Sequence, residues 1–106
     1  MAPKLYQVVR GDLSPGQQAV QSSHALVEMF IHYPELIRSW YESSNTLALL
    51  SVASEKHLKE LQLAAQLHKI PSVQFREPDR NNETTALCLG PEALRLVRKL
   101  PLALRL

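Results

Sequence analysis

Four polar side chains recur at helical spacing in the first third of the chain, namely Gln17, Gln21, His24 and Glu28. Positions i, i+4, i+7 and i+11 share one face of a helix, so these residues would form a polar stripe that begins at the helix N-terminus. The free backbone N–H groups and the helix dipole at such an end attract phosphate or a developing oxyanion. A polar stripe is also the usual solvent face of an amphipathic helix, and spacing alone favours that simpler interpretation.

A second set of charged residues follows a segment with strand character. Its members are Arg76, Glu77, Asp79 and Arg80. Carboxylates and guanidinium groups at a sheet edge could take part in acid–base chemistry or bind an anion. A charged surface loop is the alternative, and spacing alone favours it. The neighbouring Thr84 and Thr85 are favourable strand residues and need no catalytic role.

Other residue types that often carry chemistry lack a suitable setting. His32, His57 and His68 fall on predicted helix surfaces, and no Cys/His spacing suits zinc. The single cysteine, Cys88, has leucine on both sides, which predicts a buried and unreactive thiol. The chain has no Gly-rich phosphate loop, nucleophile elbow or dinucleotide fingerprint. We therefore expect no metal, no cofactor and no cysteine catalysis.

Length and composition favour one ordered domain across residues 1–106. The chain is 45% hydrophobic, with a formal net charge of +2, so composition permits a polyanionic partner without requiring one. Arg10, Arg76 and Arg80 fall at predicted strand ends or in loops, where they could form a local basic surface. A lone cysteine fits the cytoplasm, and no apolar run approaches the ~20 residues of a membrane helix.

The elements that must position these residues begin with a strand over residues 5–10 and a turn at Gly11-Asp12. Ser14-Pro15-Gly16-Gln17 has the capping-box pattern with proline at the first helical position, so a helix should run from here to about Tyr33. Its predicted buried stripe consists of Val20, Val27 and Ile31.

The middle of the chain alternates between helix and strand. Pro34 should open a short helix that ends near the Ser43-Ser44-Asn45 loop. Thr46–Ala53 is apolar on both alternating faces, which predicts a strand in the middle of a sheet. Ser54 should cap a third helix. Its predicted buried stripe consists of Leu58, Leu61 and Ala65.

The last third of the chain predicts an edge strand over Ser72–Arg76, a polar loop over 77–83 and a further strand over Thr84–Leu89. Gly90-Pro91 should then start a final helix. Its predicted apolar stripe consists of Leu94, Val97 and Leu100. The tail over 100–106 is apolar enough to pack on its own domain or on a second copy, which would make a homodimer.

Together the elements predict an α/β fold with the order β-α-α-β-α-β-β-α. A single four-stranded mixed sheet should be covered by helices, with the first two strands parallel and the last two forming a hairpin.

Three segments in order resemble the type II peptidyl-tRNA hydrolases. They are Val8-Val9-Arg10-Gly11-Asp12-Leu13, Gln21-Ser22-Ser23-His24-Ala25 and Thr85-Ala86-Leu87-Cys88-Leu89-Gly90-Pro91. Two features depart from the family pattern. The family's Gly-Lys-Gly-Lys stretch is here the shorter Gly16-Gln17-Gln18, without lysine, and its Asp-Ala-Gly-Arg-Thr-Gln loop is replaced by Arg76-Glu77-Pro78-Asp79-Arg80.

The resemblance implies hydrolysis of the ester that joins a peptide to tRNA, with tRNA as the partner. The implied catalytic residues are His24, Glu77, Thr85 and Gln21. The implied substrate-binding residues are Arg10, Asp12, Gln17, Arg76, Asp79 and Arg80. The alternative is a non-catalytic RNA-binding or dimerisation module with the same fold, in which apolar side chains would close the gap between His24, Glu77 and Thr85.

Overall fold

A mixed four-stranded sheet forms the middle layer of the structure, a computed structural model that describes residues 3–104. The strands are β1 (Lys4–Arg10), β2 (Thr46–Val52), β3 (Ser72–Glu77) and β4 (Glu83–Leu89), in the spatial order β2-β1-β4-β3. β1 is parallel to β2 and antiparallel to β4, and β3 is antiparallel to β4. The predictions of a parallel first pair, a closing hairpin and an edge position for β3 are confirmed.

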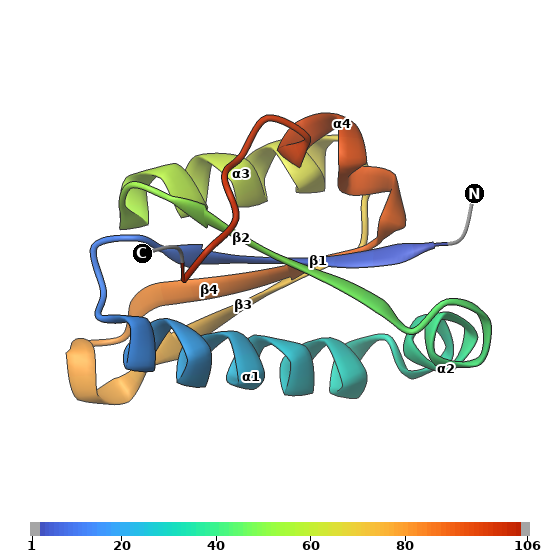
Figure 1. Ribbon diagram of the computed structural model, residues 1–106, viewed down its shortest axis with the longest axis horizontal. Coiled ribbons are helices and arrows are strands. Elements are labelled where there is room, and N and C mark those ends of the chain that lie inside the picture. The colour runs from blue at the N-terminus through green and yellow to red at the C-terminus, as the bar shows by residue number, and fades with distance from the viewer. Residues whose placement is uncertain (1–2, 105–106) are drawn as a thin grey trace.

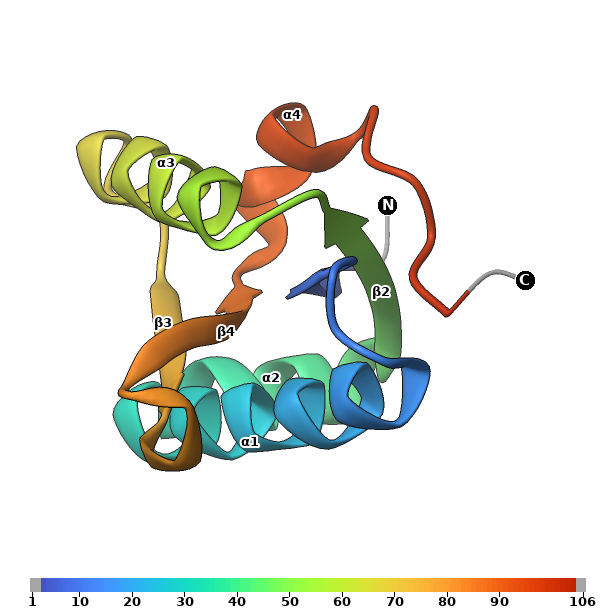
Figure 2. The same ribbon diagram turned by 90° about the vertical axis from the view of Figure 1, so that its left-hand side faces the viewer.

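Helices cover both faces of this sheet (Figures 1 and 2). One layer consists of α1 (Pro15–His32) and α2 (Pro34–Ser43), and the other of α3 (Glu55–Leu67) and α4 (Leu94–Val97). Two short 3₁₀ turns, η1 (Pro78–Arg80) and η2 (Pro91–Ala93), precede β4 and α4. The predicted α/β class and element order are confirmed. No helix within the described range combines the length and apolar content needed to cross a bilayer.

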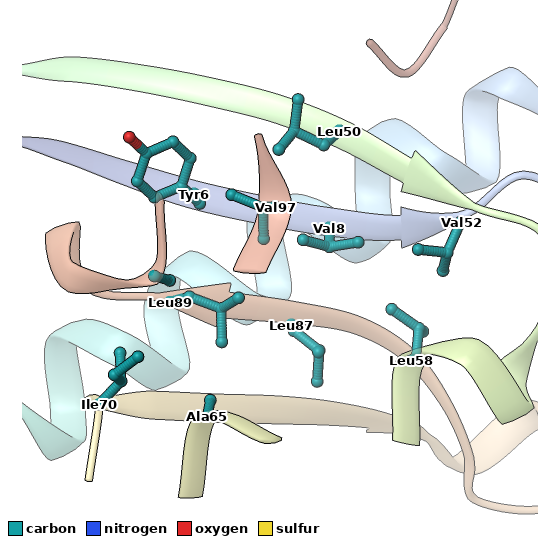
Figure 3. Close-up of a cluster of buried hydrophobic side chains, with 11 residues drawn as sticks. Tyr6, Val8, Leu50, Val52, Leu58, Ala65, Ile70, Leu87, Leu89 and Val97 are labelled. Carbon is teal, nitrogen blue, oxygen red and sulfur yellow. The ribbon is translucent and has the colours of Figure 1, made fainter. Parts of the chain in front are cut away.

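Successive side chains along each strand point to opposite faces of the sheet, and this alternation divides the core into two clusters. On β1, Tyr6 and Val8 face α3 and α4 (Figure 3), whereas Leu5 and Val9 face α1 and α2. The predicted buried stripe of α3 is confirmed, because Leu58 and Ala65 are buried and Leu61 packs against the same cluster. The two clusters fix the helix layers on the sheet, since each buries the apolar side of its helices.

The prediction that β2 lies in the middle of the sheet is wrong, because β2 is an edge strand. The C-terminal segment of the same chain covers its outer edge. The Ser51 N–H donates to the Pro101 carbonyl at 3.0 Å, and the Ala103 N–H donates to the Leu49 carbonyl at 2.9 Å. An edge strand protected in this way can stay apolar without recruiting another chain. The described part of the tail therefore packs on its own domain, while residues 105–106 lie outside the described range.

The predicted buried stripe of α1 is also wrong. Val20, Val27 and Ile31 are 54%, 57% and 63% exposed. The buried residues of this helix are instead Gln18, Gln21, Ser22, Ala25 and Met29.

Hydrogen bonds explain why polar side chains occupy the buried face of α1. The Gln18 amide donates to the Leu13 carbonyl at 2.7 Å, and the Gln7 amide of β1 donates to the Ser22 carbonyl. Buried polar groups are tolerated when such partners replace water. The helix start was predicted correctly, since Ser14 and Gln17 form the capping box and Pro15 follows it.

The last helix is shorter than its apolar spacing predicts. α4 contains four residues, and Val97 is buried, but Leu94 is exposed and Leu100 packs on the core from beyond the helix end. The predicted stripe is therefore wrong at Leu94, because the chain turns toward β2 before a full amphipathic helix can form.

The burial of α1 predicts how two substitutions on that helix differ. Met29→Ala should lower the free energy of unfolding by about 3 kcal/mol, because Met29 is fully buried and truncation leaves a cavity. Ile31→Ala should change it by less than about 0.5 kcal/mol, because Ile31 is exposed. Urea denaturation followed by circular dichroism measures both. A larger loss for Ile31→Ala than for Met29→Ala would contradict the observed orientation of α1.

Candidate active site

A β-bulge at Thr85 turns a strand residue toward α1. In the β3–β4 register, Phe75 pairs with Ala86 but Arg76 pairs with Thr84, so Thr85 is an extra residue in β4. Ala86 packs in the core cluster beneath α1 and α2, and Thr85, its neighbour, contacts Gln21 on the same side. Regular alternation would have sent these two residues to opposite faces. Bulges often re-aim side chains beside functional sites, and this one does so at the end of the sheet where β1 leads into α1.

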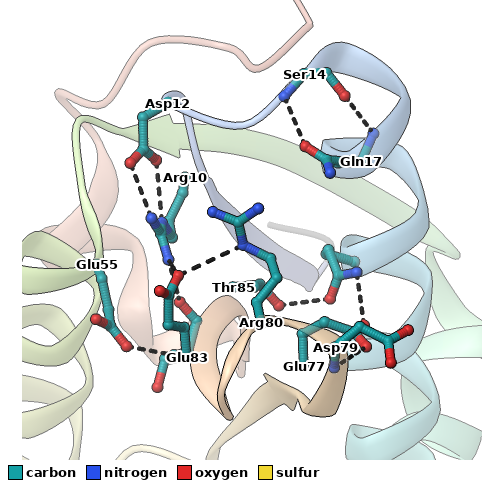
Figure 4. Close-up of polar contacts among 12 residues, drawn as sticks. Arg10, Asp12, Ser14, Gln17, Glu55, Glu77, Asp79, Arg80, Glu83 and Thr85 are labelled. Atoms are coloured by element: carbon teal, nitrogen blue, oxygen red, sulfur yellow. Dashed lines mark hydrogen bonds and ion pairs between the residues drawn. The ribbon is translucent and has the colours of Figure 1, made fainter.

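A chain of hydrogen bonds runs outward from the bulge (Figure 4). The buried Thr85 hydroxyl donates to Gln21 Oε1 at 2.6 Å, and Gln21 Nε2 donates to Glu77 Oε2 at 2.9 Å. The other carboxylate oxygen of Glu77 accepts from the Asp79 backbone N–H at 3.2 Å and so caps η1. This chain connects three separate elements, β4, α1 and the β3–η1 junction, and fixes their polar groups relative to one another.

An open cavity of about 460 Å³ lies over this hydrogen-bond chain. Its lining residues are Leu13, Gln17, Val20, Gln21, His24, Glu77, Asp79 and Arg80. The imidazole of His24 is exposed and stacks on the ring of Phe75, with centroids 4.4 Å apart and an interplanar angle of 13°. Stacking fixes the plane of the imidazole while leaving it accessible, which suits a residue that exchanges a proton with a bound molecule.

The environment of Glu77 keeps it ionised. Hydrogen bonds from the Gln21 amide and the Asp79 backbone, together with the nearby His24 imidazole, hold the pKa of Glu77 below its usual range. A carboxylate with a lowered pKa is a poor proton acceptor near neutral pH, but it orients donors well. The geometry therefore favours His24 as the proton acceptor and Glu77 as the orienting group.

The N-terminus of α1 has fewer free amides than the sequence pattern indicated. Pro15 has no N–H, and the Gln17 N–H donates to Ser14 Oγ at 3.2 Å. The Gln18 N–H donates to the Ser14 carbonyl, which leaves only Gly16 from the first turn. The Gln17 side chain caps the helix through Oε1, which accepts from the Ser14 N–H at 3.2 Å. Its NH₂ group remains available as a donor on the cavity wall.

Arg10 lies beside the cavity as a buried anchor. Its side chain is 8% exposed. Nε and Nη2 donate to the two oxygens of Asp12 at 3.0 and 2.9 Å, and Nη1 donates to Glu83 at 2.7 Å. These hydrogen bonds hold the pKa values of Asp12 and Glu83 below their usual range. The Arg10 guanidinium thus donates its hydrogen bonds to carboxylates of the protein itself, unlike an exposed arginine that binds phosphate.

The structure brings most of the sequence-predicted residues to this end of the sheet. Gln17, Gln21, His24, Glu77, Asp79 and Arg80 line the cavity, while Thr85 lies beneath it. Arg76 is exposed on β3 and does not line the cavity. Sequence reasoning missed Glu83 and Phe75. Alternation along β3 would have placed Phe75 on the α1 side with Val73, but nothing in the sequence indicates the double ion pairing of Glu83.

Two further findings bear on the chemistry. Within residues 3–104, no group of three or more His, Cys, Asp or Glu side chains is placed to hold a metal ion. Burial raises the pKa of Cys88 to about 12, so its thiol stays protonated, as the sequence predicted for a buried cysteine.

Comparison with known proteins identifies the family. Residues 3–106 match the family model described as peptidyl-tRNA hydrolase PTH2, and the chain therefore belongs to that family. Peptidyl-tRNA hydrolases from two strains of Methanococcus maripaludis are each 28% identical to it over 109 residues, covering 93% of this chain and 94% of each relative. The prediction of a hydrolase that acts on peptidyl-tRNA is confirmed at the level of the family.

The ion pairs of Arg10 predict how stability depends on pH. Because Asp12 and Glu83 have lower pKa values in the folded chain, the stability they contribute is present above their unfolded values of roughly 4 and is lost as pH falls through the folded values. The free energy of unfolding should therefore begin to fall as the pH drops below about 5 and should continue to fall at lower pH. In Arg10→Met the fall should be smaller.

Denaturation with urea at a series of pH values measures this dependence. Arg38→Met is the matched control, because Arg38 is exposed on α2 and should leave the wild-type pH dependence unchanged. An unaltered acid fall in Arg10→Met would show that the two carboxylates do not depend on Arg10.

Proposed function

We propose that the cavity over the Thr85–Gln21–Glu77 chain is where the protein cleaves the ester between peptide and tRNA. The observation that carries the proposal is the convergence of His24, Glu77 and Gln21, from two separate segments, on one open polar cavity. Family membership gives the reaction class, and the cavity supplies an oriented base, a carboxylate and amide donors in one place.

In the proposed reaction, water attacks the ester carbonyl carbon and His24 accepts the proton that the water loses. The ionised Glu77 orients the imidazole and the water, and the proposed donors for the developing oxyanion are Gln17 Nε2 on the cavity wall and the N–H of the preceding Gly16. The bond from the carbonyl carbon to the ribose oxygen then breaks, and that oxygen takes the proton from His24. The products are a peptide acid and tRNA with a free terminal hydroxyl.

Thr85 and Gln21 have a different role in this proposal. Thr85 is fully buried and its hydroxyl proton is already donated to Gln21, so it acts as a positioning residue. Gln21 lines the cavity, yet its amide oxygen and nitrogen are both engaged, by Thr85 and Glu77. Together they hold the Glu77 carboxylate in a fixed place, which is how positioning away from the reacting atoms lowers a barrier.

The tRNA portion carries phosphate groups, and Arg80 on the cavity wall and Arg76 on the neighbouring strand are the proposed cations for them. Asp79 and Gln17 line the same wall and can bind ribose hydroxyls. Arg10 and Asp12 support this wall through their ion pair. A translation substrate and a buried free thiol favour the cytoplasm as the compartment.

The open cavity favours an enzyme over a non-catalytic module, because His24 and Glu77 both line it and Thr85 is linked to it through Gln21. A homodimer stays a prediction. The homodimer was predicted from the apolar C-terminal tail. The described part of that tail packs on β2 of its own chain.

Loss of the proposed base should abolish most turnover. His24→Ala should lower kcat on N-blocked aminoacyl-tRNA by about 100-fold or more, because proton transfer in the transition state is lost. Glu77→Gln should lower kcat by about tenfold, because the amide keeps the shape and still accepts a hydrogen bond but loses the charge. Release of deacylated tRNA in single-turnover assays measures both.

His57→Ala is the matched control, because His57 is an exposed histidine on α3, in the opposite helix layer. It should retain wild-type kcat. Full turnover in His24→Ala, or an equal loss in His57→Ala, would remove His24 from the proposed role.

A further inference from the structure

Arg80 is the single cation among the described residues that line the cavity. It shares the wall with two carboxylates, Glu77 and Asp79, so the acidic groups outnumber it. An anionic substrate would meet net repulsion at this wall unless the guanidinium is held where a phosphate must sit. The exact placement of Arg80 therefore matters more than it would on a generally basic surface.

The backbone brings Arg80 to the cavity but does not fix its side chain. Glu77 caps η1, and the chain then turns back through Asn81 and Asn82, which both have left-handed backbone conformations. The Asn82 N–H donates to the Glu77 carbonyl at 3.0 Å and closes the turn. An arginine side chain still has many rotamers from such a fixed backbone, so an additional contact is needed to select one.

Glu83 supplies that contact (Figure 4). One carboxylate oxygen, Oε1, lies 2.7 Å from Arg10 Nη1 and forms a longer ion pair, without a hydrogen bond, with Arg80 Nε at 3.5 Å. A single oxygen thus bridges a buried guanidinium and a cavity guanidinium. Within residues 3–104, the terminal nitrogens of Arg80 make no hydrogen bond or ion pair, so they are free to bind an anion while Nε faces Glu83.

Arg10 holds the Glu83 carboxylate in one position. The Arg10 side chain is buried, and its Nε and Nη2 donate to the two carboxylate oxygens of Asp12. These constraints hold the guanidinium in one orientation, in which Nη1 donates to Glu83. The four charges of Arg10, Asp12, Glu83 and Arg80 balance one another. Arg10, at the end of β1, therefore fixes Glu83, the first residue of β4, and Glu83 in turn restricts Arg80 on the cavity wall.

We infer that Glu83 is a positioning residue that holds Arg80 over the cavity, so that the free Arg80 nitrogens bind a phosphate of the terminal nucleotides of the tRNA. This inference rests on the proposed function and adds to it a named phosphate contact and the relay Arg10–Glu83–Arg80 that orders it. Neither Glu83 nor Arg10 touches the substrate.

A double-mutant cycle tests the relay through binding. Arg80→Ala should raise KM, and the Kd for deacylated tRNA, by about tenfold, the loss of one charge-assisted contact. Glu83→Gln should raise both by about threefold, as expected for a partly exposed ion pair. The double variant should bind no more weakly than Arg80→Ala alone, because Glu83 acts only through Arg80. All three should keep kcat within about twofold of wild type.

Glu42→Gln is the matched control. Glu42 is exposed on α2, a helix that lies at the end of the sheet away from the β1–α1 turn (Figure 1), and its loss of charge should leave KM and Kd unchanged. If the increase in Kd of the double variant equalled the product of the two single increases, the relay would be overturned, since Glu83 would then act independently of Arg80. Unchanged Kd values in both single variants would overturn the phosphate contact itself.

The binding readout keeps this test separate from the test of the proposed function. Binding of deacylated tRNA needs no hydrolysis, so the relay can fail while turnover persists, and turnover can be absent while the relay holds. Should Glu83→Gln not fold, Arg80→Lys replaces it, because lysine keeps the charge but has no Nε to face Glu83. An unchanged Kd in Arg80→Lys would overturn the positioning role.

Discussion

The site depends on the buried hydrogen bond between the Thr85 hydroxyl and the Gln21 amide oxygen. This contact orients the amide so that its nitrogen points at Glu77, and Glu77 in turn caps η1, the turn that carries Asp79 and Arg80. A buried polar network of this kind is stable only when each member has its partner. One local irregularity, the bulge that turns Thr85 inward, therefore organises the whole polar end of the sheet.

Charge at this end of the sheet is arranged in two layers. The inner layer is the buried Arg10 with its two carboxylate partners, and the outer layer is the cavity wall with Glu77, Asp79 and Arg80. The inner layer supports the wall from beneath, and Glu83 belongs to both layers, because it pairs with Arg10 and with Arg80. In the proposed function, this division lets a chain with a net charge of only +2 hold one cation in a fixed place for an anionic substrate.

Much of the fold and part of the site could be predicted from the sequence. Capping and turn residues gave the order of elements, because Ser14, Pro15 and Pro34 act locally. Longer-range features could not be predicted. The apolar spacing of α1 suggested the wrong buried face because the buried Gln21 finds its hydrogen-bond partners, Glu77 and Thr85, far along the chain. The bulge at Thr85 could not be predicted either, because the residue types along β4 do not indicate it. Glu83 lay in what looked like a solvated loop, since its partner Arg10 is 73 positions away.

The central claim is that Gln21 transmits order from Thr85 to Glu77, and Gln21→Met tests it most directly. Methionine keeps the volume and helical propensity of glutamine but removes both hydrogen bonds. With the fold verified by circular dichroism, single-turnover hydrolysis of N-blocked aminoacyl-tRNA should slow by about tenfold or more, because Glu77 loses its fixed position. Wild-type turnover in a folded Gln21→Met variant would contradict the account.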